Sequence, residues 1–185
     1  MPRKKTVTDE AVLDAALKAM FRSGPADFTL ADVAREAGVA PSTLLQRFGS
    51  KRRLVLRAIE RDNALFAATI RTASSAAGAE SVIALFMLLT PDLGPDDSLT
   101  DEMLWLREDF SDPALNALAR DRLRTLRAAV TARLPPLKTP PAVGARLLEA
   151  QWQGARTQWG FFREGRLSDY VRRALRDWFA LAGAQ

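Results

Sequence analysis

The chain of 185 residues is 48% hydrophobic, enough to bury one large core or two small ones, and its formal net charge of +5 makes an anionic partner worth testing. Because it has neither cysteine nor histidine, disulfides, thiolate nucleophiles, most zinc sites and any Ser-His or Cys-His relay are excluded. We expect a cytoplasmic protein with no metal, no cofactor and no membrane partner, since the longest apolar run (81–89) is too short to cross a bilayer.

Nearly every segment shows the period of an amphipathic helix, and almost none alternates as a strand would. We therefore expect an all-α protein of about nine helices, separated by turns rich in glycine, proline and serine. The fourth helix should be long, because no glycine or proline interrupts it before Gly78. The expected helices cover residues 9–22, 30–37, 41–48, 51–77, 80–90, 101–110, 113–134, 141–164 and 168–182.

The second and third expected helices are short and lie three residues apart. Thr29 can cap the first of the pair, Gly38 ends it, and Pro41 suits the opening position of the next, where its missing N–H costs nothing. Two short helices joined by a glycine-bearing turn make a helix-turn-helix. Such a motif places its second helix in the major groove of DNA.

The start of that second helix carries small and neutral polar side chains, which allow a close approach to base edges. Gln46 can address an adenine, and Arg47 a guanine or a phosphate. Lys51 opens the fourth helix, where backbone N–H groups and the helix dipole favour a phosphate. The candidate residues for DNA contact are Thr29, Pro41, Ser42, Thr43, Gln46, Arg47 and Lys51.

Positive charge gathers at the N-terminal end. Residues 1–63 hold twelve Lys and Arg against eight Asp and Glu, whereas 64–185 hold fifteen against fourteen. Because phosphate neutralisation supplies most non-specific affinity for DNA, a basic arm at 1–7 should add contacts. The open alternative is a stable three-helix fold with a solvated basic face, the favoured interpretation for Arg57 and Arg61.

Residues 8–59, centred on TLADVAREAGVAPSTLLQRFGSKRRLV, resemble the N-terminal domain of the TetR/AcrR family of transcriptional repressors. The resemblance implies a DNA-binding domain over 1–53 and a helical ligand-sensing and dimerisation domain over 54–185. Leu45 departs from the family, which usually has a tyrosine there that meets the DNA backbone. A contact is therefore lost or moved, and the operator preference is left open.

The last two expected helices carry apolar stripes that could form a self-complementary four-helix interface between two copies of the chain. A homodimer would present two recognition helices to half-sites related by the same symmetry. The alternative is that both stripes are buried within one protomer. The candidate dimerisation residues are Leu148, Ala155, Trp159, Phe162, Val171, Leu175 and Trp178.

A ligand pocket would be lined mainly by apolar and aromatic side chains with a few polar groups. The candidates are Phe86, Met103, Trp105, Phe110, Trp152 and Arg156, although such residues at helical spacing also serve as core. The expected effector is small and hydrophobic, and whether it releases or promotes DNA binding is open.

The favoured hypothesis is a homodimeric repressor that binds a double-stranded DNA operator and responds to a small-molecule effector. The alternative is a basic helical module that binds an acidic protein or a membrane surface. An enzyme is disfavoured, because the sequence has no Gly-rich phosphate loop, metal-ligand cluster or nucleophile–base pair.

Overall fold

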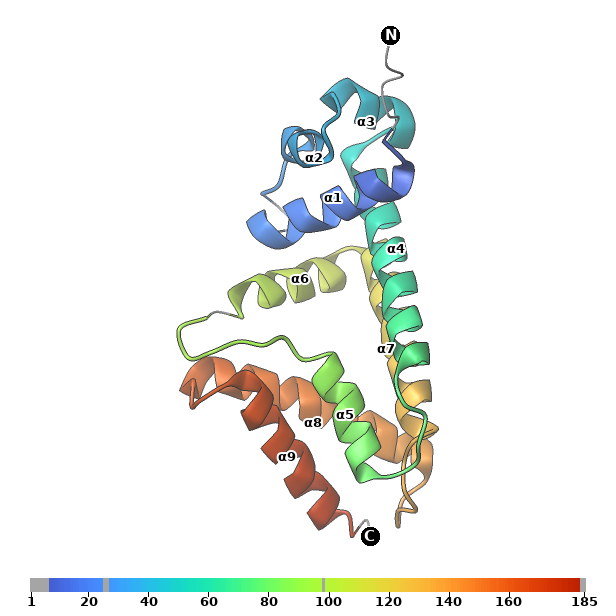
Figure 1. The fold of residues 1–185 in the computed structure, drawn as a ribbon, viewed down its shortest axis with the longest axis vertical. Helices are drawn as coiled ribbons and strands as arrows, with labels where there is room; N and C mark the ends of the chain where they lie inside the picture. Colours follow the sequence, from blue (N-terminus) through green and yellow to red (C-terminus); the bar gives the residue numbers. More distant parts are fainter. Residues whose placement is uncertain (1–6, 25–26, 98, 184–185) are drawn as a thin grey trace. The chain divides into compact units, whose positions relative to one another are not determined.

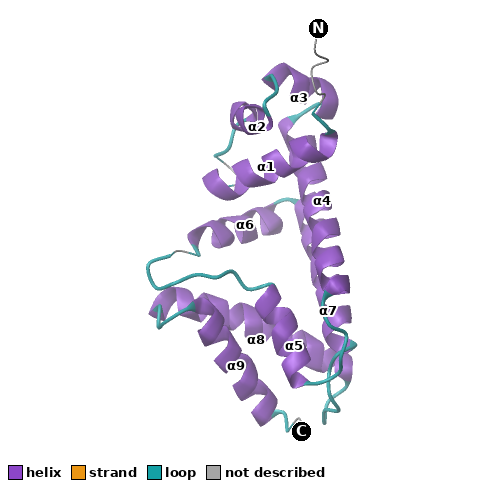
Figure 2. Ribbon diagram, viewed as in Figure 1, coloured by secondary structure: helices purple, strands orange, loops and turns teal. Residues whose placement is uncertain are grey.

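The computed structural model describes residues 7–24, 27–97 and 99–183, with only the backbone of 100–102. Within these ranges the secondary structure is entirely helical (Figure 2), as predicted. The helices are α1 (Asp9–Ser23), α2 (Leu30–Ala37), α3 (Pro41–Phe48), α4 (Lys51–Thr72), α5 (Ala79–Leu88), α6 (Thr100–Ser111), α7 (Pro113–Thr131), α8 (Pro141–Phe162) and α9 (Leu167–Leu181).

The end of α4 differs from the prediction. The helix stops at Thr72 rather than continuing to residue 77. Arg133, which is only 6% exposed, donates from its guanidinium to the carbonyl oxygens of Ser74 at 2.8 Å and Ile70 at 3.3 Å. These carbonyls have no partner within the helix, so a buried cation satisfies them and ends α4 without glycine or proline.

The chain divides into two compact units. The first unit comprises the described residues up to 66 together with 100–120, and the second unit comprises 67–99 and the described residues from 121 onward. The first unit is therefore larger than the predicted domain 1–53, because it also takes in most of α4, α6 and the start of α7.

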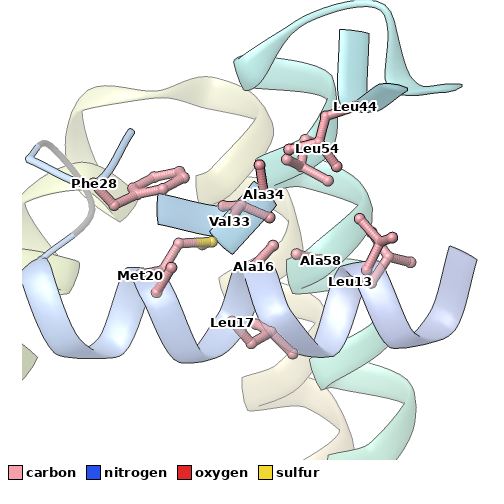
Figure 3. Packing of buried hydrophobic residues seen from close by; sticks show 12 residues of the cluster. Leu13, Ala16, Leu17, Met20, Phe28, Val33, Ala34, Leu44, Leu54 and Ala58 are labelled. Atoms are coloured by element: carbon pink, nitrogen blue, oxygen red, sulfur yellow. The ribbon is translucent and has the colours of Figure 1, made fainter. Parts of the chain in front are cut away.

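In the first unit, α1, α2 and α3 gather around the first turns of α4 (Figure 1). Their core combines large and small side chains, and Figure 3 shows Ala16, Ala34 and Ala58 among the leucines. These alanines have no more than 3% exposure and let the helices approach closely. The larger members of the cluster include Leu13, Leu17, Met20, Phe28, Val33, Leu44 and Leu54.

The corner between α6 and α7 is held to the helix-turn-helix segment within the first unit. Asp112 caps α7 by accepting a hydrogen bond from Ala114 N at 2.8 Å. The same carboxylate also accepts hydrogen bonds from both terminal nitrogens of Arg52. On α6, the Trp105 ring lies 5.7 Å from that of Phe21. Arg52 therefore joins α4 to the start of α7, although its side chain is 60% exposed.

In the second unit, α8 packs against α9, and α9 against α5 (Figure 1). Apolar side chains of α8 and α9 meet at this interface, with Trp159 and Leu175 fully buried. The Trp159 indole N–H donates to the carbonyl of Gly165 at 3.0 Å, which fixes the link between the two helices. The buried Glu149 is paired with Arg127, so its charge is compensated.

Candidate nucleic-acid interface

The start of α2 is fixed by a complete capping box. Thr29 Oγ1 accepts from Asp32 N at 3.2 Å, while Asp32 Oδ2 accepts from Thr29 N at 2.9 Å and from its hydroxyl at 2.6 Å. These bonds from Thr29, aided by Arg35, lower the pKa of Asp32 to about 2. Thr29 therefore acts first as a helix cap, and its hydroxyl and N–H are already used within α2.

The turn between α2 and α3 depends on one glycine. Gly38 has φ 68° and ψ 34°, in the left-handed region, and its N–H bonds the carbonyl of Ala34. Pro41 then opens α3, as predicted, after Ala40 in an extended conformation. This short turn sets the direction in which α3 leaves α2.

The two faces of α3 have different chemistry. Leu44 is 1% exposed, and Phe48 packs against the core of the first unit, so this face anchors the helix. Thr43 is half-buried. The opposite face is exposed and brings together Pro41, Ser42, Leu45 and Gln46. Three of the predicted base-facing residues thus lie on one accessible helix face.

Arg47 does not join that exposed face. Its NH2 donates to the carbonyl oxygen of Val7 at 2.7 Å, and its Nε lies 3.2 Å from Asp9 Oδ1. The prediction placed this side chain at a guanine or a phosphate, but its guanidinium is directed to the start of α1. The partners stand about forty residues earlier in the chain, so no local pattern indicates the pairing.

The predicted start of α4 is confirmed. Ser50 Oγ accepts from Arg53 N at 3.2 Å and so caps the helix. Lys51 is half-buried, with its ammonium 4.2 Å from the centre of the Phe28 ring. This contact positions the Lys51 side chain on the core beneath the helix-turn-helix.

The solvated-face interpretation holds for one of the two arginines to which it was applied. Arg57 is exposed beside Glu60. Arg61 instead binds Asp14 on α1 through two hydrogen bonds of 2.6 and 2.9 Å. These bonds lower the pKa of the Asp14 carboxyl and raise the pKa of the Arg61 guanidinium. Arg61 and Asp14 therefore form a structural ion pair within the first unit.

Most of the predicted dimerisation stripe is buried within the protomer, which is the alternative given for it above. Because α8 and α9 pack on each other, these side chains already form the core of the second unit. Phe162 is 65% exposed, and Trp178 is half-buried. The five buried residues are Leu148, Ala155, Trp159, Val171 and Leu175.

The predicted ligand-binding residues divide between the two units. Phe86, Trp152 and Arg156 lie together in the second unit, where the two rings are 5.4 Å apart and the guanidinium lies 4.6 Å from the indole. The indole N–H of Trp152 also donates to Thr90 Oγ1 at 2.9 Å. The others, Met103, Trp105 and Phe110, stand on α6 in the first unit.

No group of three or more acidic side chains among the described residues could hold a metal ion. None of the helices described is both long enough and apolar enough to cross a membrane.

The helix-turn-helix segment is similar to segments of known proteins. Residues 12–58 match the family described as bacterial regulatory proteins, tetR family. The HTH-type transcriptional regulator BetI of Agrobacterium fabrum is 42% identical over 50 residues, which make up 27% of this chain and 24% of BetI. The chain thus spans about a quarter of the length of this curated relative.

Solved structures resemble the fold over almost the whole chain. A transcriptional regulator from Rhodococcus sp. Rha1 has a TM-score of 0.73 at 20% identity, covering 96% of this chain and 97% of its own. A putative transcriptional regulator from Saccharomonospora viridis, in complex with choline, has a TM-score of 0.70 at 23% identity, covering 93% and 95%. These relatives are transcriptional regulators by name. Residues 12–58 are therefore similar to the helix-turn-helix of the tetR family of bacterial regulatory proteins.

Proposed function

We propose that this chain is a cytoplasmic, homodimeric transcriptional repressor that a small, hydrophobic effector releases from its DNA operator. The exposed face of α3 is the single observation that carries the proposal. Pro41, Ser42 and Gln46 are accessible there, while Leu44 anchors the opposite face. A helix with small and amide side chains outward can enter the major groove and hydrogen-bond base edges.

Phosphate contacts would orient α3 in the groove. The capped start of α4 offers backbone N–H groups beside Lys51, and helix N-termini favour phosphate. Thr29 stands at the equivalent end of α2. The predicted basic arm, with Arg3, Lys4 and Lys5, lies outside the described residues, and we expect it to add salt-sensitive affinity.

The outward faces of α8 and α9 replace the buried stripe as the proposed dimer interface. On α8, Leu147, Gly154 and Phe161 lie on one exposed face, and a Cβ on Gly154 would meet nothing within 4 Å. Phe161 is 82% and Leu181 90% exposed. A groove of about 410 Å³ lies on the same surface, lined by Gln151, Gln158, Glu164, Tyr170, Arg173, Ala174, Asp177, Trp178 and Leu181. A second copy of the chain would bury these aromatic and leucine side chains.

The aromatic cluster of the second unit is the proposed starting point for the effector site. Phe86 and Trp152 supply apolar surface, and Arg156 supplies a polar group. The Saccharomonospora viridis relative is in complex with choline, which supports a small-molecule effector for this chain. An effector acts here only if it binds better to the conformation that does not fit the operator.

The test is a titration of promoter DNA flanking the chain's own gene, followed by fluorescence anisotropy at 50 and 200 mM salt. We expect sequence-selective binding that weakens by about a thousandfold or more between the two concentrations for six or more phosphate contacts. Gln46→Ala should reduce the preference for the promoter over scrambled DNA, whereas Arg57→Ala, on an exposed site of α4, serves as the matched control. Equal binding of promoter and scrambled DNA by the native protein would reject the proposal.

A further inference from the structure

Leu45 is an apolar side chain on the face of α3 that carries no core contacts. It is 47% exposed, whereas its neighbour Leu44 is 1% exposed. Pro41 and Ser42 precede it by one helical turn and are also exposed, so the three side chains are neighbours on one surface. Leu45 is therefore available to a partner that approaches this face.

The backbone at this position has a separate role. The carbonyl oxygen of Leu45 accepts a hydrogen bond from Gly49 N at 2.8 Å and closes the end of α3. This bond does not depend on the side chain. The helix can therefore form with a smaller residue at position 45, which leaves the exposed isobutyl group without a structural reason in the first unit.

The chemistry of the major groove offers one kind of apolar partner. Base edges there present hydrogen-bond donors and acceptors, apart from the C5 methyl group of thymine. A leucine placed against a polar edge would remove water without returning a hydrogen bond, which costs free energy. Against a thymine methyl, the same side chain buries apolar surface on both sides.

We infer that Leu45 is a specificity-determining residue that contacts the C5 methyl group of a thymine in each operator half-site. The inference rests on the proposed function, since it requires α3 to lie in the major groove. Pro41, one turn earlier, extends the apolar surface. Gln46, the next residue, is then left to read a neighbouring base pair by hydrogen bonds.

The experiment uses the full chain and the promoter duplex bound in the titration above. Each thymine is replaced singly by deoxyuridine, which removes the methyl group and keeps the hydrogen bonds of the base pair. For the native protein, we expect one position in each half-site at which the dissociation constant rises about fourfold. For Leu45→Ala, binding should be weaker with thymine and unchanged by deoxyuridine at that position.

Two further variants control for indirect effects. Leu65→Ala removes a leucine of similar exposure (46%) from α4 in the same unit, and it should keep the native response to deoxyuridine. Leu45→Met keeps an apolar side chain and should retain part of the response. Circular dichroism melting establishes that each variant folds.

The outcomes separate this inference from the proposed function. Selective DNA binding with no response to any deoxyuridine, or an equal response in Leu45→Ala and the native protein, would overturn the role of Leu45 alone. Absence of selective DNA binding would overturn both. Loss of the methyl response in Leu45→Ala, with retention in Leu65→Ala, is the result that supports it.

Discussion

Arg47 on α3 is joined to Asp9 at the start of α1, with Nε 3.2 Å from Oδ1, while its NH2 donates to the carbonyl of Val7. The pair connects the end of α3 to the start of α1. Because the guanidinium is used in this way, we expect Arg47 to position Val7 and the start of α1 rather than to read a base.

Arg47→Ala should therefore weaken DNA binding by a similar factor for every sequence. We expect a loss of about 1 kcal/mol in the free energy of unfolding, because one charge-assisted hydrogen bond and a partly exposed ion pair disappear. Urea unfolding and anisotropy titrations with the promoter and single-base variants measure the two effects. A loss of discrimination at one guanine would show that Arg47 reads a base after all.

The capping box of α2 predicts a specific response to acid. The pKa of Asp32 is lowered to about 2 by its hydrogen bonds with Thr29, so the carboxylate stabilises the fold fully above its ordinary pKa of about 4. This contribution is lost as the pH falls through about 2. The difference in unfolding free energy between the native protein and Asp32→Ala should therefore shrink between pH 5 and pH 2. A difference that stays constant over this range would contradict the assignment.

Substitution of Arg133, a residue of the second unit, should have a large effect on stability. Arg133→Ala removes the donor to the buried carbonyl oxygen of Ile70 and to the carbonyl oxygen of Ser74. We expect about 2–4 kcal/mol of destabilisation. Arg124→Ala is the control, because its side chain is 63% exposed, and it should change stability by no more than about 0.5 kcal/mol. Similar melting curves for the two variants would rule out the capping role.

If the proposed dimer interface is correct, substitutions on the exposed and buried faces of α8 should have different effects. Phe161→Glu introduces a charge at an 82% exposed position, so it should give folded monomers with greatly weakened operator binding. Leu148→Ala removes a buried core side chain and should cost about 2–5 kcal/mol of unfolding free energy. Sedimentation velocity and thermal melting distinguish the two. A Phe161→Glu protein that remains dimeric would exclude this face.

The helix pattern was predictable because its signals are local. Thr29, Gly38 and Pro41 each act through their own backbone geometry, and they set the bounds of α2 and the start of α3 as expected. The end of α4 was not predictable in this way. It depends on Arg133, which lies about sixty residues further along the chain.

The candidate sites show the same limit. Periodicity identified Leu148 and Trp159 as members of one buried stripe, but it cannot say whether the covering surface belongs to the same protomer or to a second copy. Leu147 and Phe161 belong to a second apolar stripe, which lies about one residue away from the first around the helix. Its pattern is hard to recognise in the sequence because polar residues such as Gln158 lie on the same face. Likewise, Arg47 met every local criterion for a DNA contact, and only the position of Asp9 in space shows its other partner.

The double role of Asp112 has a practical consequence for chimeric regulators. Because one carboxylate both begins α7 and holds Arg52, exchange of sensor regions at residue 53 would separate Arg52 from its counter-ion and Phe21 from Trp105. A graft that carries residues 100–120 along with the N-terminal helices would keep these partners. Recombination points for new biosensors are therefore better placed near residues 66, 99 and 120, where the two units meet in sequence.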